Sequence, residues 1–124
     1  MNTNQTVVID KKAAKLLLSL GVTPNNIGYV YINYSMCLAT ENHLYLTKLT
    51  KQLYPATAKR YNTTCGSVES AIRHIVAYIW ERNKIDNINH AFGLPVYTNS
   101  YDRPSNGEFL SLLFETIRLD IASL

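Results

Sequence analysis

The chain has 124 residues, of which 47% are hydrophobic and 17% charged, and its formal net charge is +3. This length suits one domain, and this balance of residues argues against a disordered chain. No apolar run approaches the roughly 20 residues of a membrane span, and the polar start of the chain does not match a signal peptide. We therefore expect a cytoplasmic protein without a membrane partner.

The first half of the chain predicts three helices after a polar tail formed by residues 1–9. Residues 10–20 form the first helix, which Gly21 closes as a C-cap. Residues 23–40 form the second helix, which opens on a capping threonine followed by a proline. Residues 45–53 form the third. Helical spacing predicts these inward-facing residues: Ala13, Ala14, Leu17, Leu18, Ile27, Val30, Tyr31, Tyr34, Leu38, Leu46, Leu49 and Leu53.

Residues 54–74 predict two helices joined by a tight polar turn. Pro55 suits the first turn of a short helix, because a missing N–H costs nothing there. The Asn-Thr-Thr run at residues 62–64 favours a turn and offers an N-cap for a second helix reaching about Arg82. The apolar stripe of that second helix comprises Val68, Ala71, Ile72, Ile75, Val76 and Ile79. Its opposite face, near the helix start, carries Gly66, Ser67, Glu69, Ser70, Arg73 and His74.

This arrangement is typical of a helix-turn-helix, in which the second helix presents a polar N-terminal half. Taken alone, the pattern fits two ordinary packed helices equally well.

The last part of the chain predicts two more helices. Residues 85–92 form a short helix ended by Gly93, and residues 94–103 form a loop. A final helix starts within residues 104–108. Its inner face comprises Phe109, Leu112, Leu113, Thr116, Ile117 and Ile121. With no period-two strand, the predicted fold class is all-α, a single-domain bundle of about six helices over residues 10–124.

The sequence does not carry the motifs of common enzymes. A glycine-rich phosphate loop, a nucleophile elbow and a zincin motif are all missing. The three histidines and two cysteines share no metal-ligand spacing, and the carboxylates form no recognisable acid/base pair. We therefore expect no enzyme activity, catalytic residue, metal, cofactor or small-molecule substrate.

Two surface patterns each allow two interpretations. Several basic residues flank the second helix of the pair and either neutralise DNA phosphates or form a solvated surface. They are Lys48, Lys51, Lys59, Arg60, Arg73, Arg82 and Lys84. Among nine tyrosines, Tyr29, Tyr31, Tyr34 and Tyr45 either stack on bases or edge the core. Their positions on predicted helices favour the core.

Pieces of a longer pattern occur in a fixed order over nearly the whole chain. They are Gly28-Tyr29-Val30-Tyr31, Thr47-Lys48, Leu53-Tyr54-Pro55, Ala58-Lys59-Arg60-Tyr61-Asn62-Thr63-Thr64, Val68-Glu69, Ala71-Ile72-Arg73-His74, Trp80, Asn83, Ile85-Asp86, Phe92-Gly93, Pro104, Asn106, Glu108-Phe109 and Arg118-Leu119. This ordered set resembles the C-terminal DNA-binding effector domain of the stage zero sporulation protein A family, the response regulators that initiate endospore formation.

The resemblance implies that the second helix of the pair enters the major groove of a box with a T-G-x-C-G-A-A core. It places base-reading roles on Glu69, Ser70, Arg73 and Ser67. Glutamate can accept a hydrogen bond from cytosine N4, and arginine can bind guanine through two bonds. Two serines, Ser67 and Ser70, stand where the family has arginines, so this chain is expected to read a different box, bind more weakly or not read bases. Expected contacts to the DNA backbone come from Lys59, Arg60, Thr64, His74 and Lys48.

Two functions remain open. The first is sequence-specific transcription regulation on double-stranded DNA, as a homodimer on paired sites. The second is a degenerate effector domain that modulates a family member through protein–protein contacts. Glu69 and Arg73 favour the first, whereas Ser67 and Ser70 favour the second. The family's receiver domain has no counterpart here, so the chain is either an effector half or a stand-alone relative. A start at Met1 favours the latter, although a cloned fragment would look the same.

Overall fold

The computed structural model of the protein describes residues 3–97 and 102–122, and every regular element within those ranges is a helix. The predicted all-α fold is therefore confirmed. The elements are α1 (Thr3–Ser19), α2 (Ile27–Glu41), the short helices η1 (His43–Leu46) and η2 (Leu49–Leu53), α3 (Tyr54–Arg60), α4 (Cys65–Arg82), α5 (Ile85–Phe92) and α6 (Asn106–Ala122).

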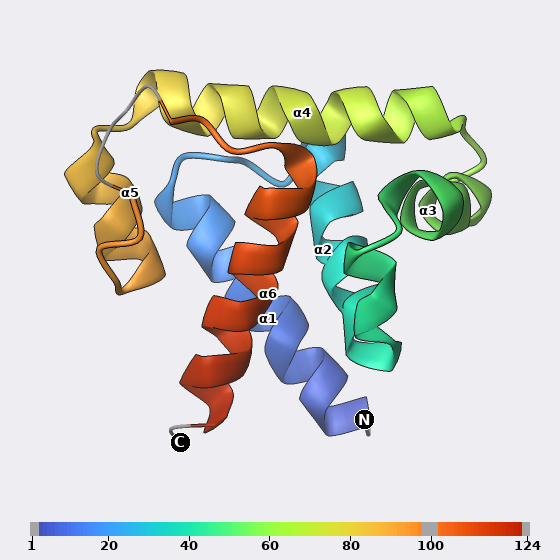
Figure 1. Cartoon of the computed structure of the whole chain (residues 1–124), viewed down its shortest axis with the longest axis horizontal. Coiled ribbons are helices and arrows are strands. Elements are labelled where there is room, and N and C mark those ends of the chain that lie inside the picture. The colour runs from blue at the N-terminus through green and yellow to red at the C-terminus, as the bar shows by residue number, and fades with distance from the viewer. Residues whose placement is uncertain (1–2, 98–101, 123–124) are drawn as a thin grey trace.

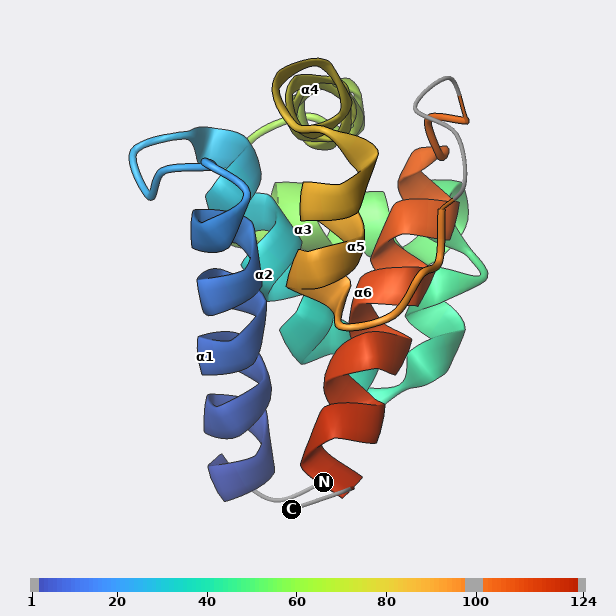
Figure 2. The same ribbon diagram turned by 90° about the vertical axis from the view of Figure 1, so that its left-hand side faces the viewer.

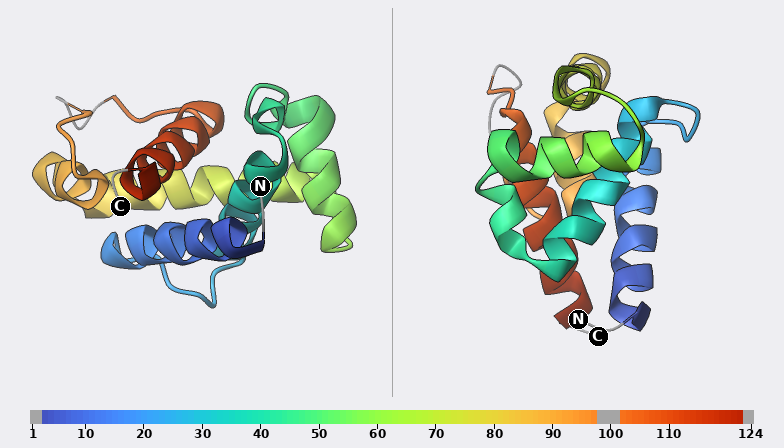
Figure 3. Two further views of the ribbon diagram at one scale, coloured as in Figure 1. Left: turned by 90° about the horizontal axis from the view of Figure 1, so that it is seen from below. Right: turned by 90° about the vertical axis from the view of Figure 1, so that its right-hand side faces the viewer.

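The longest helix, α4, lies across one end of the molecule (Figure 1). Helices α1, α2 and α6 extend away from it, α3 packs beneath its N-terminal end, and α5 hangs from its C-terminal end (Figures 1 and 2). The first turns of α1 and the last turns of α6 lie together at the opposite end of the molecule (Figure 2). One long side of α4 is thus left open to solvent above the bundle (Figure 3).

The inner face of α4 forms the roof of the hydrophobic core. Its predicted apolar stripe is confirmed, because Ile72 is 0% exposed and Ile75 is 1% exposed. Ala71, at the edge of the stripe, is half-buried. The core beneath α4 is built mainly from Leu17, Leu20, Ile32, Met36, Leu53, Ile88, Phe109, Leu110 and Leu113.

Gly28 lets α2 approach α4 closely. A Cβ atom at this position would lie 2.6 Å from the carbonyl oxygen of Ala71 and would also overlap the side chain of Ile75. Real Cβ atoms essentially never make non-bonded contacts this short, so any larger residue would push the two helices apart. This crossing therefore fixes the position of α4 on the bundle.

The first two helices differ from the prediction at their starts. Helix α1 begins at Thr3 rather than at Asp10, and residues 3–9 belong to it instead of forming a tail. Ile9 is 2% exposed, so packing extends the helix beyond its predicted start. The cap of α2 is Asn26 rather than Thr23, since the Asn26 side chain accepts from the N–H of Gly28 at 3.0 Å.

Some predicted inward-facing positions are also wrong. Leu18 is 47% exposed and Ile27 is 52% exposed. In α2 the predicted Tyr31 and Leu38 are buried, and the core also includes Ile32, Met36 and Ala39, which lie one step around the helix from the predicted stripe. In α6, Leu110 and Phe114 are buried although they were not predicted to be. The predicted side chain of Ile121 and the loop residues 98–101 lie outside the described parts.

The predicted third helix is split into η1 and η2. The backbone of Lys48 leaves the helical region, with φ −132° and ψ 60°. Just before it, the hydroxyl of Thr47 donates to the carbonyl of Leu44 at 2.9 Å, a side-chain bond that competes with helical continuation. Leu53 is fully buried, while Leu46 and Leu49 are only partly buried.

Candidate nucleic-acid interface

The turn between α3 and α4 has well-defined capping chemistry. Asn62 adopts the left-handed conformation with φ 52°, which asparagine tolerates better than most residues. The N–H of Thr63 donates to the carbonyl of Ala58 at 2.9 Å, closing α3 in the manner of a Schellman motif. Thr64 then caps α4, because its hydroxyl oxygen accepts from the N–H of Ser67 at 3.1 Å. Backbone groups at the end of α3 and at the start of α4 therefore find hydrogen-bond partners within the turn itself.

Three of the four predicted base-reading residues form one hydrogen-bonded group on α4. The Nε of Arg73 donates to Oε1 of Glu69 at 3.1 Å, and its Nη2 donates to Oγ of Ser70 at 3.3 Å. Oγ of Ser70 in turn donates to Oε2 of Glu69 at 3.4 Å. The side chains of Arg73 and Glu69 are 56% and 39% exposed, so water reaches the group. Such an exposed pair adds little stability, and its main effect is to orient the guanidinium.

The fourth predicted base reader, Ser67, lies apart from this group at the start of α4. Its hydroxyl accepts from the hydroxyl of Thr64 at 2.9 Å, so in the free protein it belongs to the helix cap. Gly66 beside it is exposed, and a Cβ atom added at this position would meet the hydroxyl of Thr64 at 4.0 Å without a clash.

The residues predicted to contact the DNA backbone are all exposed, but they come from three places. Lys59 and Arg60 lie in the last turn of α3, and the Arg60 guanidinium rests over the Tyr61 ring at 5.3 Å. Thr64 and His74 flank the base-reading group along α4. Lys48 lies before η2, in a shallow pocket that it shares with Lys51 and Gly107.

Beneath the predicted base-reading group, α6 contributes an asparagine for which the sequence predicts no functional role. The side-chain nitrogen of Asn106 donates to the hydroxyl of Tyr54 at 3.0 Å and to the carbonyl of Glu69 at 3.1 Å. All three residues line one open pocket together with Arg73 and the loop before α6. The sequence signals for Asn106 were its place at the predicted start of a helix and its match to the family pattern.

Two tyrosines considered for base stacking pack instead against the helix-turn-helix. The rings of Tyr31 and Tyr34 lie 5.4 Å and 5.5 Å from the ring of Tyr61. Tyr31 is only 5% exposed, which agrees with the interpretation that these rings edge the core.

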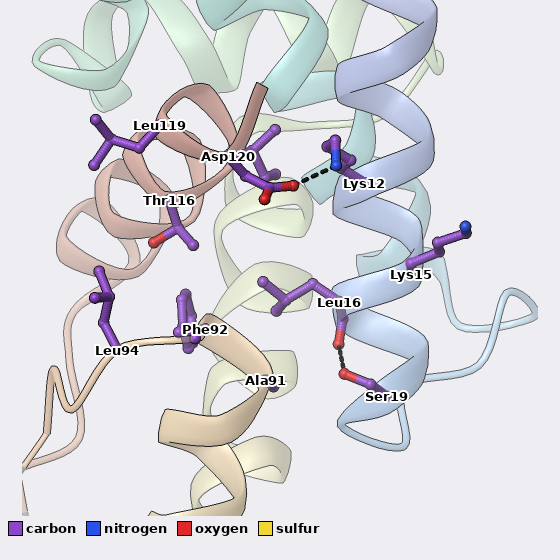
Figure 4. A pocket seen from close by; sticks show the side chains of 12 residues that line it. Lys12, Lys15, Leu16, Ser19, Ala91, Phe92, Leu94, Thr116, Leu119 and Asp120 are labelled. Atoms are coloured by element: carbon purple, nitrogen blue, oxygen red, sulfur yellow. Dashed lines mark hydrogen bonds and ion pairs between the residues drawn. The ribbon is translucent and has the colours of Figure 1, made fainter. Parts of the chain in front are cut away.

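Another open pocket lies between the second half of α1, the end of α5 and the second half of α6 (Figure 4). Leu94, Thr116 and Leu119 line one side, and the ion pair between Lys12 and Asp120 crosses it (Figure 4). Within residues 3–97 and 102–122, no group of three or more histidine, cysteine or acidic side chains could hold a metal ion. None of the helices in those ranges is long and apolar enough to cross a membrane.

A short helix, a capped turn and a long helix with an exposed polar start define a helix-turn-helix domain. The family described as sporulation initiation factor Spo0A C terminal matches residues 13–117. The match covers most of the chain, and the chain belongs to this family of DNA-binding effector domains of sporulation regulators. The predicted resemblance is thereby confirmed, and the family is one of DNA-binding domains rather than of enzymes.

Proposed function

We propose that the protein is a sequence-specific transcription regulator that reads double-stranded DNA in the major groove with the N-terminal half of α4. The observation that carries this proposal is the hydrogen-bonded group of Glu69, Ser70 and Arg73 on the exposed face of α4. A polar group of this kind on the second helix of a helix-turn-helix stands where base edges are read.

Arg73 is the residue best suited to read a guanine. Its Nε is engaged by Glu69 and one hydrogen of Nη2 by Ser70, which leaves Nη1 and the second hydrogen of Nη2 for O6 and N7 of a guanine. Because Glu69 and Ser70 both hold the side chain, less conformational freedom is lost when the contact forms. A good bidentate contact of this type discriminates by roughly 1–3 kcal/mol.

Glu69 has two roles in this proposal. One carboxylate oxygen holds Arg73, and the other, which accepts only a long bond from Ser70, is free to accept from cytosine N4. Ser70 and Ser67 supply single hydroxyls that adapt to several bases but cannot form a bidentate pair with guanine. The chain is therefore expected to read a shorter or different box from the one the resemblance implies.

Affinity that does not depend on sequence comes from the cations around this face. Lys59 and Arg60 extend from the end of α3, and Lys48 extends from the segment before η2. Thr64 and His74 add hydrogen-bond donors beside the base-reading group. We also propose that two copies bind paired sites as a homodimer, which would double the number of phosphates contacted.

The direct test compares Arg73→Ala with Arg118→Ala. Both arginines are exposed and paired with a glutamate of their own helix, but Arg118 lies near the far end of α6. Arg73→Ala should weaken binding to the best-bound duplex by about 1–3 kcal/mol and affect a scrambled duplex less. Arg118→Ala should leave both affinities unchanged.

A mobility-shift titration at two salt concentrations measures these affinities. Equal loss in both variants would mean that Arg73 acts only through net charge. If the wild-type protein binds no duplex, the proposal is wrong and the protein-interaction function becomes the better account.

A further inference from the structure

The side chain of Asn106 joins three helices at one buried point. Asn106 is 9% exposed and Tyr54 is 6% exposed. The two hydrogens on the Asn106 side-chain nitrogen allow it to donate to the Tyr54 hydroxyl and to the Glu69 carbonyl at the same time. Tyr54 begins α3, Glu69 lies on α4, and Asn106 begins α6. Figure 1 shows the first turn of α6 directly beneath α4.

This junction acts on the backbone of a base-reading residue. The Glu69 carbonyl has two lone pairs, so it can accept from Asn106 as well as from the main chain one turn later. The bond from Asn106 therefore holds the turn of α4 that carries the Glu69 and Arg73 side chains. Through Tyr54, the same amide holds the start of the first helix of the pair.

The side chains of Asn106 and Tyr54 are largely shielded from water, although the pocket that they line is open. Burial raises the pKa of Tyr54 above its ordinary value, and its hydroxyl is protonated at neutral pH. A buried amide without hydrogen-bond partners costs more free energy than an exposed one. Arrangements of the three helices that break these bonds are therefore disfavoured.

We propose that Asn106, together with Tyr54, is a positioning residue for base reading: it sets the height and rotation of α4 relative to α3. This inference rests on the proposed function of α4. A bidentate contact from Arg73 to guanine requires the right position to within a fraction of an ångström, whereas contacts from flexible lysines to phosphates do not. Loss of the junction should therefore reduce discrimination between sequences more than it reduces overall DNA binding.

The experiment compares the wild type with Tyr54→Phe, Asn106→Ala and Asn89→Ala. Tyr54→Phe keeps the ring and removes one acceptor. Asn89 is the matched control, because its side chain also makes two hydrogen bonds outside its own helix, donating to the carbonyl of Tyr97 and accepting from its N–H, but it lies on α5. The quantity measured is the ratio of dissociation constants for a scrambled duplex and the best-bound duplex, at a temperature where circular dichroism shows all four proteins folded.

Tyr54→Phe should lower this ratio by about 2- to 12-fold, the range for one lost neutral hydrogen bond, and Asn106→Ala should lower it further. Asn89→Ala should lower the melting temperature but keep the wild-type ratio.

If Tyr54→Phe and Asn106→Ala also keep the wild-type ratio, the junction is merely structural and the inference is wrong. Should Asn106→Ala not fold, Tyr54→Phe alone decides. A wild-type protein that does not discriminate between duplexes would overturn the proposed function first, and this inference with it.

Discussion

The serine at position 70 changes the chemistry of the exposed face of α4 in a specific way. In the structure, its hydroxyl accepts from Arg73 and donates to Glu69. A serine here therefore does more than remove the arginine expected from the resemblance, because it also helps to hold the remaining arginine. The proposed reading group is therefore built around one oriented guanidinium.

Replacing this serine tests how much specificity depends on it. Ser70→Arg should raise preference for the T-G-x-C-G-A-A core, since arginine's planar fork matches the two acceptors of guanine. Ser111→Arg is the control, because it adds the same charge at an exposed position on α6. Competition between the family core and a scrambled duplex measures the effect. An equal gain on both duplexes would show that Ser70→Arg contributes only charge.

For the residues of this face, the sequence predicted which side chains lie together on α4, but it did not predict all of their contacts. Glu69, Ser70 and Arg73 were placed together correctly because helical spacing of three and four brings them onto one face. The link from Ser67 to the helix cap could have been anticipated from the Thr64 to Ser67 spacing. The role of Asn106 could not, because its partners lie 37 and 52 positions away in the chain.

At the scale of helices, the position of α4 depends on a glycine in another element. Gly28 and Gly66 both occupy the second position of a helix, after the caps Asn26 and Thr64. Gly28 faces the backbone of Ala71, whereas Gly66 faces open space. The same substitution should therefore have opposite consequences at the two sites.

Gly28→Ala should destabilise the protein by about 1–3 kcal/mol, because the added methyl group forces α2 away from α4. Gly66→Ala should be neutral or stabilise by up to about 1 kcal/mol, since alanine loses less conformational entropy in a helix. Urea unfolding followed by circular dichroism gives both values. Equal effects of the two substitutions on stability would contradict the close approach of α2 and α4 at Gly28.

The helices also show where sequence patterns stop being informative. The bounds of α4 and α5 were predicted closely because a strong apolar stripe, a threonine cap and Gly93 mark them. The start of α1 was missed because its first residues are polar and have modest helix propensity, whereas packing of Ile9 supports the extended helix. The break at Lys48 was missed because apolar spacing continues through it.

At the scale of the whole molecule, the exposed face of α4 and the pocket of Figure 4 are built from different helices, because the pocket is lined by α1, α5 and α6. The core contains several aromatic rings, and Tyr97 packs against it with its ring centroid 4.9 Å from that of Trp80. Burial, helped by the negative charge of Glu108, raises the pKa of Tyr97 from 10.0 to about 12.

This raised pKa predicts a loss of stability at alkaline pH. Below about pH 10 the Tyr97 hydroxyl is protonated in both the folded and unfolded chains, so its contribution to stability is complete. As the pH rises from about 10 towards 12, the unfolded chain ionises first and that contribution is lost. Urea unfolding of the wild type and Tyr97→Phe at about pH 9 and about pH 11 measures it. The variant should lose less stability between the two, and an equal loss would contradict the assignment.

The central claim is that the N-terminal half of α4 reads bases through an oriented Arg73. Selection of bound sequences from a random duplex pool, with the wild type and Arg73→Ala side by side, tests it most directly. The account predicts that the wild type enriches one motif and that the variant enriches the same motif with one G·C position relaxed, because only the Arg73 contact is lost. Identical motifs from both proteins, or no enriched motif from the wild type, would contradict it.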